Sequence, residues 1–369
     1  MFPTIEYLEW IAGKPEAATH DLGSSDLRGT FQHQRGPIPG RLAGLDDPPP
    51  ERDLDRQLAD CYGVDESNVL VTAGATMANF VAIATAIQQA GDTGDASGPQ
   101  VLVEKPGYEP LRASARALGG RVDRFLRPPE DGYPLVPGRV EAALMDDAGL
   151  VVTTNRHNPS GEFTAVETVA ETARAADDYG ARVLVDEVYA PYVTDLTTDG
   201  PFGAPTAAGV ENTVVTGSLT KFMGLGGLRV GWLLADADFV EAARSVAWHL
   251  PALAEPSVAL AARALEHREE LVPAQRDLLA ANHELLAGFV AERDDLAGEI
   301  PPGSSFGFVE HASVGGDDLA ARAWEEYDLL VVPGRFFDRP EAVRLSLGRS
   351  AGHCEEALAV FGDLLDTLS

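Results

Sequence analysis

One segment of this chain combines residue types that could bind both an aldehyde and a phosphate. It runs from Ser218 to Arg229 and contains Lys221 among small residues. Lysine is rare here, because the 369 residues include only Lys14, Lys105 and Lys221. A lysine amine can form a Schiff base with an aldehyde, whereas a guanidinium cannot, because it stays protonated. The near-complete use of arginine as the basic residue therefore favours a chemical role for Lys221.

The neighbours of Lys221 suit a phosphate group. Ser218 lies three positions before the lysine and Arg229 lies eight positions after it. Hydroxyl and guanidinium groups bind phosphate oxygens, so the segment fits pyridoxal phosphate, which carries an aldehyde and a phosphate. The alternative is a surface lysine in a flexible glycine-rich loop, and this segment alone does not separate the two.

A second candidate phosphate contact follows the apolar run at residues 69–72. Gly74, Ala75 and Thr76 open the helix that is expected after this run. Backbone N–H groups at a helix start, together with the Thr76 hydroxyl, can hold an anion. Small residues are also common at any strand-to-helix turn, so this motif alone is a weak signal.

Two further polar groups follow expected strands. Asn158 opens an Asn-Pro-Ser-Gly turn, and its amide could donate to a ligand oxygen. Asp186 ends the apolar run at 183–186, where a carboxylate is costly unless a cation meets it. A protonated pyridine nitrogen would be such a cation, and Tyr189 could bond to the phenolic oxygen of the same ring. The alternative for Asp186 is a cap of the next helix.

These residues need an α/β framework to bring them together. Short β-branched runs predict buried strands, and Ala-rich stretches such as 77–90 and 165–179 predict helices between them. The alternation predicts a mainly parallel sheet covered on both faces, with functional loops at the carboxyl ends of its strands. The expected strands are 69–72, 101–104, 150–154, 183–186, 213–216 and 229–233.

From about residue 252 the pattern changes and predicts a second, smaller domain. Long helices are expected at 256–266 and 274–293, and strands at 306–309 and 343–347. We therefore expect three parts: an N-terminal arm with part of the small domain (1–45), a large domain (46–250) and a small C-terminal domain (251–369).

The composition limits the partners and the location of the protein. The formal net charge is -30, and the acidic residues are spread along the whole chain. This favours adaptation to a saline cytoplasm, where salt screens the repulsion, over an acidic surface for a basic partner. Without a basic patch we expect no nucleic-acid partner, and without a long apolar run we expect no membrane span. The two cysteines predict reduced thiols, and no histidine spacing suggests a metal.

Order and spacing make these motifs similar to those of the class I/II aminotransferases, pyridoxal-phosphate enzymes of fold type I. The matching residues are Gly74-Ala75-Thr76, Tyr108, Asn158-Pro159-Ser160-Gly161, Asp186-x-x-Tyr189, Ser218-x-x-Lys221, Arg229, Val331-Val332-Pro333-Gly334 and Val343-Arg344-Leu345-Ser346. The resemblance implies a mainly parallel seven-stranded sheet sandwiched by helices, with a smaller α+β domain. It also implies transfer of an amino group from an L-amino acid to a 2-oxo acid by a homodimer.

The resemblance also implies catalytic roles. Lys221 would form the Schiff base with the cofactor and later move a proton at the substrate, and Asp186 would keep the pyridine nitrogen protonated. Tyr189 and Asn158 would hydrogen-bond the phenolic oxygen of the cofactor, and Tyr108 would stack on its ring.

Binding roles follow in the same way. The phosphate contacts would be Gly74, Ala75, Thr76, Ser218 and Arg229. Arg344 would bind the substrate α-carboxylate with its bidentate fork, together with Asn158 and Gly23. Arg349 is the alternative to Arg344.

Two departures from the family leave the substrate open. No tyrosine occurs at 40–48, where relatives usually carry one that reaches the partner's cofactor, and the loop at 21–28 is unusual. Arg28, His33 and Arg41 could contact a substrate side chain, or they could lie in an exposed arm.

The alternatives to transamination are another reaction of the same cofactor, namely a lyase, decarboxylase or cyclising synthase, and a non-catalytic module. The apolar N-terminal arm is expected to pack at least partly on the partner subunit.

Overall fold

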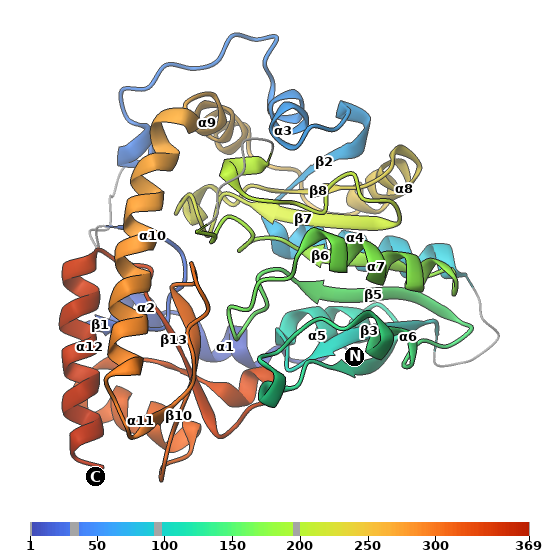
Figure 1. Ribbon diagram of the computed structural model, residues 1–369. Helices are drawn as coiled ribbons and strands as arrows, with labels where there is room; N and C mark the ends of the chain where they lie inside the picture. Colours follow the sequence, from blue (N-terminus) through green and yellow to red (C-terminus); the bar gives the residue numbers. More distant parts are fainter. Residues whose placement is uncertain (1, 30–36, 92–97, 195–199, 369) are drawn as a thin grey trace.

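The computed structural model describes residues 2–29, 37–91, 98–194 and 200–368 and contains a seven-stranded sheet (Figure 1). Its strands are β2 (Val69–Thr72), β3 (Gln100–Lys105), β4 (Arg121–Leu126), β5 (Ala148–Thr154), β6 (Arg182–Asp186), β7 (Thr213–Ser218) and β8 (Gly231–Leu234). The spatial order is β2-β8-β7-β6-β5-β3-β4, and β8 alone runs antiparallel to its neighbours. The prediction of a mainly parallel seven-stranded sheet is confirmed.

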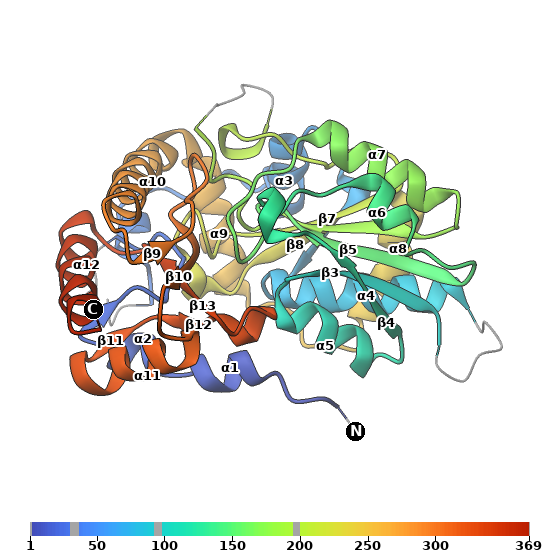
Figure 2. The ribbon, with the colours of Figure 1, turned by 60° about the horizontal axis from the view of Figure 1, so that its bottom comes forward.

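Helices cover both faces of this sheet, because successive strand residues point to opposite sides. Val101 and Val103 of β3 pack in one core and Leu102 packs in the other. The first face is covered by α4 (Ala75–Ala90), α5 (Glu109–Ala117) and α8 (Ala237–Ala247). The second face is covered by α3 (Leu54–Tyr62), α6 (Pro137–Glu141), α7 (Val166–Asp177) and α9 (Glu255–Glu266). Figure 2 shows the two helical layers with the sheet between them.

A second, antiparallel sheet is built by the C-terminal part of the chain. Its strands are β9 (Leu296–Ala297), β10 (Phe306–His311), β12 (Val332–Pro333) and β13 (Ala342–Ser346), in the order β12-β13-β10-β9. The register places Phe308 opposite Arg344. The helices that pack beside it are α10 (Arg268–Ala291), α11 (Gly316–Tyr327) and α12 (Ala351–Asp366), with α10 and α12 side by side in both views (Figures 1 and 2).

The N-terminal segment joins these two regions. It contains α1 (Glu6–Ile11), α2 (Lys14–Ala17) and β1 (His20–Asp21), which pairs with β11 (Leu329–Leu330). Tyr7 and Trp10 pack on Phe336 of their own chain, with ring centroids 5.6 Å and 5.3 Å away. Phe2 and Leu8 remain 72% and 38% exposed. Part of the apolar face of α1 is therefore covered within one subunit, although none of its residues is fully buried.

Short 3₁₀ helices connect the main elements at Gly40–Leu42, Glu66–Asn68, Pro129–Asp131, Pro201–Gly203, Gly226–Leu228 and Gly334–Phe337. Within the described residues, none of the helices combines the length and the apolar character that crossing a bilayer requires.

Candidate active site

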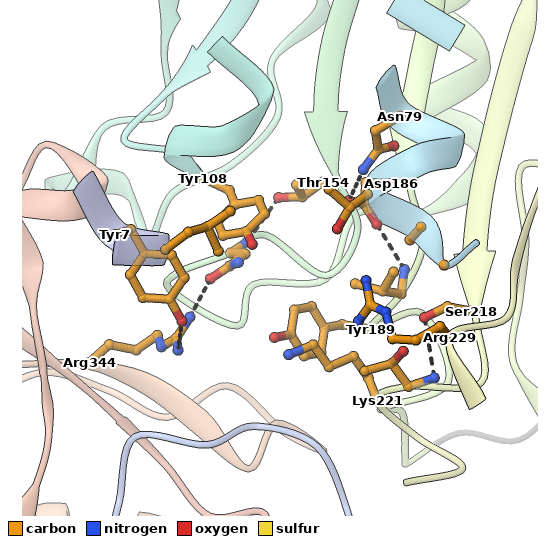
Figure 3. A pocket seen from close by; sticks show the side chains of 17 residues that line it. Tyr7, Asn79, Tyr108, Thr154, Asp186, Tyr189, Ser218, Lys221, Arg229 and Arg344 are labelled. Atoms are coloured by element: carbon orange, nitrogen blue, oxygen red, sulfur yellow. Dashed lines mark hydrogen bonds between the residues drawn. The ribbon is translucent and has the colours of Figure 1, made fainter. Parts of the chain in front are cut away.

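A cavity of about 300 Å³ lies at the carboxyl ends of the parallel strands (Figure 3). Eleven of the predicted site residues line it: Gly74, Ala75, Thr76, Tyr108, Asn158, Asp186, Tyr189, Ser218, Lys221, Arg229 and Arg344. Gly23 does not line the cavity, but its carbonyl accepts a hydrogen bond from Arg344 at 3.3 Å. The structure therefore brings these twelve residues together.

One end of the cavity has the features of a phosphate site. The turn after β2 requires glycine at position 74, because φ is +83° and a Cβ would lie 3.4 Å from Nη2 of Arg229. Gly231 lets β8 pass directly beside this turn, since a Cβ there would lie 2.5 Å from the amide nitrogen of Ala75. Ser218 ends β7 opposite Gly231. The Ser218 hydroxyl, the Arg229 guanidinium and the amino end of α4 therefore lie together at this end of the cavity, where they could bind an anion.

Asp186, at the end of β6, provides a buried negative charge. Its side chain is 4% exposed and accepts hydrogen bonds from Nδ2 of Asn79 at 2.7 Å and from the Val188 amide at 3.2 Å. Burial raises the pKa of Asp186 to about 6. No cation forms an ion pair with it within the described part of the chain. The position suits a ligand that brings a protonated nitrogen.

Lys221 lines the cavity next to Tyr189 (Figure 3). Its Nζ is 3.2 Å from Oγ of Ser25 and 5.4 Å from the ring centroid of Tyr189. Burial alone would lower the pKa of Lys221, but Tyr189, Asp26 and Tyr7 together outweigh burial and raise it. Without a ligand the cavity therefore holds this nitrogen as an ammonium group.

The other end of the cavity contains a buried guanidinium. Arg344 of β13 is 2% exposed, and Nη1 donates to Oδ1 of Asn158 at 3.0 Å, whereas Nη2 lies 3.4 Å from the Tyr7 hydroxyl. Its Nε has no partner, and no carboxylate contacts the side chain among the residues that the structure describes. Because a buried cation normally has an anionic partner, this arrangement suits a carboxylate brought by a ligand.

Arg349, the alternative candidate, has a different environment. Its guanidinium forms ion pairs with Asp21 at 2.7 Å and with Asp26 at 3.6 Å. Arg28 pairs with Asp26 in the same cluster, and Arg41 donates to the carbonyls of Met223 and Arg28. These three arginines bind groups of their own chain, and His33 lies outside the described residues.

A buried polar cluster supports Asn158. Glu104 forms a fully buried ion pair with Arg127 at 2.8 Å and accepts hydrogen bonds from Thr153 and from the amide and hydroxyl of Thr154. The Thr154 hydroxyl in turn accepts a hydrogen bond from the backbone amide of Asn158 at 2.8 Å. This chain of contacts fixes the turn after β5 and so positions the Asn158 side chain beside Arg344.

Sequence reasoning missed several residues that line the cavity, among them Tyr7, Asn79 and Thr154. Tyr7 belongs to the apolar N-terminal arm, and its ring lies edge-on to Tyr108, with the ring centroids 5.8 Å apart. Asn79 had one weak signal, since it is a polar residue one turn into an Ala-rich helix.

The cavity offers a suitable group for each charged or reactive part of pyridoxal phosphate. The turn at Gly74 with Arg229 suits its phosphate, Asp186, which has no ion-pair partner among the described residues, suits its pyridinium, and Lys221 suits its aldehyde. Fold and site together define a pyridoxal-phosphate-dependent enzyme of fold type I.

Comparison with known proteins gives the family. The family "Aminotransferase class I and II" matches residues 41–361, so the chain belongs to this family and is a pyridoxal-phosphate-dependent transaminase. It is 29% identical to histidinol-phosphate aminotransferase from Halobacterium salinarum, over 85% of this chain and 81% of the relative. It is also 29% identical to capreomycidine synthase from Streptomyces vinaceus, over 73% and 69%.

Solved structures support the fold. An aminotransferase from Streptococcus suis superposes with a TM-score of 0.84 at 21% identity, covering 100% of this chain and 99% of the other. An aspartate aminotransferase from Thermotoga maritima gives 0.79 at 20% identity, covering 99% and 98%. These similarities show the same architecture.

Proposed function

We propose that this transaminase binds pyridoxal phosphate with the residues of the cavity in the following roles. Bound there, the cofactor supplies an aldehyde for amines and a ring that withdraws electrons from the amine carbon. Ser218, Arg229 and the turn of Gly74, Ala75 and Thr76 hold the phosphate. Asp186 holds a proton on the ring nitrogen through its charge, and Asn79 keeps that carboxylate in place.

The remaining residues act on the substrate and on the faces of the ring. The Lys221 amine takes up and returns a proton at the substrate Cα, and Tyr108 covers one face of the cofactor. Tyr189 and Asn158 donate hydrogen bonds to the phenolic oxygen. Nothing in these roles depends on the side chain of the substrate.

The observation that carries the substrate assignment is the environment of Arg344. A guanidinium that is 2% exposed, has an unpartnered Nε and has no carboxylate neighbour in the described structure requires an anion. We infer that Arg344 binds the α-carboxylate of an amino acid bidentately, with the Asn158 amide and the Gly23 carbonyl fixing the guanidinium.

A donor and acceptor screen tests this function. The holoenzyme is incubated with single L-amino acids and a set of 2-oxo acids, and new amino acids are identified by mass spectrometry. We expect the amino group to move between one class of donor and at least one acceptor. Consumption of an amino acid without any transfer to an acceptor would contradict transamination as the main activity.

A second candidate reaction follows from one of the relatives. The chain is 29% identical to a protein named capreomycidine synthase, so a cyclising reaction on an amino acid is an alternative use of the same cavity. The first proton transfer at Cα is common to both reactions. The same screen separates them, because a cyclisation needs no 2-oxo acid and leaves the nitrogen in the product.

We also propose that the protein is a homodimer. We further propose that each subunit has the domain limits expected from the sequence, namely 1–45, 46–250 and 251–369. Trp248 is 82% exposed and Phe2 is 72% exposed, and burial in a subunit interface would remove both from water. Light scattering, which gives the molecular mass in solution, on the wild type and on Trp248→Ser at working salt tests the proposed dimer. A wild-type monomer with full activity would contradict the dimer.

The net charge supports a further proposal, that the enzyme works in a saline cytoplasm. Salt screens the repulsion that a charge of -30 creates, so melting temperatures should rise from low to molar salt. A melting temperature that does not depend on salt would argue against this adaptation.

A further inference from the structure

The side chain of Ser25 connects two functional groups of the cavity. Its Oγ lies 2.6 Å from the Tyr189 hydroxyl and 3.2 Å from Nζ of Lys221. The residue is 2% exposed, so no bulk water competes for these contacts. Ser25 comes from the N-terminal segment, 196 positions before the lysine in the sequence.

The backbone of this segment is fixed from both sides. The Ser25 carbonyl accepts a hydrogen bond from the Tyr192 hydroxyl at 2.7 Å. The Leu27 amide donates to the carbonyl of Lys221 at 2.9 Å, which joins the segment to the backbone of the lysine itself. On the other side, the Ser24 amide donates to Oδ1 of Asp21 at 3.0 Å. These contacts hold the hydroxyl at one place between the lysine and the phenol.

The hydrogen-bond capacity of the three groups makes Ser25 a two-way link. An ammonium group can only donate, whereas a hydroxyl donates once and accepts twice. While Lys221 is protonated, it donates to Ser25, and Ser25 is free to donate to Tyr189. When the nitrogen loses its proton, Ser25 can donate to it and accept from Tyr189 instead.

We propose that Ser25 is a positioning residue whose hydroxyl carries changes in the protonation of Lys221 to Tyr189. The inference rests on the proposed function, in which Lys221 moves the proton and Tyr189 contacts the cofactor. Ser25 stabilises the protonated nitrogen as its only described hydrogen-bond acceptor. Removal of the hydroxyl should therefore make the proton leave at lower pH.

Substitution at position 25 leaves the charged side chains around the lysine in the sequence. The titratable and charged groups that face Lys221 or share its cavity are Tyr7, Asp26, Tyr108, Asp186, Tyr189, Arg229 and Arg344. None of them is replaced in the Ser25 variants, and Tyr189 loses its hydrogen bond to Ser25 when the hydroxyl is removed. A shift between variants therefore reports on the link that the hydroxyl makes between Lys221 and Tyr189.

The test measures the protonation of Lys221 directly in the full-length protein after removal of the cofactor. Brief labelling with acetic anhydride across the alkaline range, followed by peptide mass spectrometry, gives the pH midpoint at each lysine. Lys14 and Lys105 serve as internal references. In Ser25→Ala the midpoint at Lys221 should fall by about one pH unit, since a hydrogen bond to a charged group is lost. Ser25→Thr, which keeps the hydroxyl, should retain the wild-type midpoint.

A second readout uses the holoenzyme. The pH midpoint of the change in cofactor absorption should move in Ser25→Ala and return in Ser25→Thr. Identical midpoints at Lys221 in the wild type and Ser25→Ala would overturn the inference, and so would an equal shift in both variants. If the labelling shift occurs but borohydride does not attach the cofactor to Lys221, the proposed function fails, whereas the hydrogen-bond link between Lys221 and Ser25 stands.

Discussion

The two ends of the cavity are built from different parts of the chain. At the cofactor end, Gly74, Asp186 and Ser218 each lie at the end of a strand of the large sheet or in the turn that follows it. At the substrate end, Tyr7 comes from α1 and Arg344 from β13 of the smaller sheet. In Figure 3, Tyr7 and Arg344 lie at one side of the view, and Asp186 and Ser218 lie away from them. The chemistry is therefore fixed within one sheet, whereas substrate recognition depends on how distant segments meet.

The largest expected effect is at the cofactor end. Asp186→Asn keeps the size of the side chain but removes the charge that holds the ring proton, so kcat should fall on the order of 10³-fold. The matched control is Glu187→Gln. Glu187 is also buried, with its pKa raised by burial to about 7, but it bonds to Thr206 and Ala207 outside the cavity. Steady-state kinetics on both variants checks this, and equal losses would mean that Asp186 is only structural.

The next effect separates Arg344, at the substrate end, from Arg349, the alternative candidate for the substrate carboxylate. Arg344→Lys keeps a positive charge but loses the bidentate fork, so KM for the amino acid should rise on the order of 10²-fold with a smaller change in kcat. Arg349→Lys is the matched control, because its carboxylates at Asp21 and Asp26 belong to the chain. It should lower the melting temperature and leave KM nearly unchanged. The opposite pattern would make Arg349 the substrate ligand.

A pH measurement tests the charge at the cofactor end without any substrate. The pKa of Asp186 is raised to about 6 in the folded protein, so the folded state holds this proton more tightly than the unfolded state. The free energy of unfolding of the cofactor-free protein should therefore fall as pH rises from about 4 to about 6, by about 3 kcal/mol from this group.

Urea unfolding of the wild type and Asp186→Asn at constant ionic strength isolates that contribution. The variant should lose this part of the pH dependence, because its amide does not titrate. Parallel profiles for the two proteins would show that burial does not perturb this carboxyl.

The smallest effect concerns the phenol at the substrate end. The Tyr7 hydroxyl lies 3.4 Å from Arg344, so Tyr7→Phe should raise KM only about threefold, the value of one weak hydrogen bond. Tyr133→Phe is the control, since its hydroxyl bonds to Arg339 away from the cavity. A loss of kcat in Tyr7→Phe with KM unchanged would instead place this phenol in the chemical step.

The same contrast explains what the sequence could predict. Asp186, Ser218 and Gly74 were predictable, because a polar or glycine residue directly after an apolar strand is a local signal. β4 was not predicted as a strand, because it is an edge strand with charged, half-buried residues such as Arg124.

The missed contacts share one physical cause. Ser25 meets Lys221 across 196 positions, and Tyr7 meets Arg344 across 337 positions. Such contacts depend on how separate elements pack together rather than on a local sequence pattern, so no spacing in the sequence predicts them. The choice between Arg344 and Arg349 likewise depended on where Asp21 and Asp26 lie in the folded chain.

The identity of the cofactor lysine is the most direct test of the whole account. Borohydride reduction of the holoenzyme, followed by digestion and peptide mass spectrometry, locates the attached cofactor among Lys14, Lys105 and Lys221. We expect the cofactor mass on the peptide that contains Lys221 and on no other. Attachment at Lys14 or Lys105, or no attachment at any lysine, would contradict the central claim.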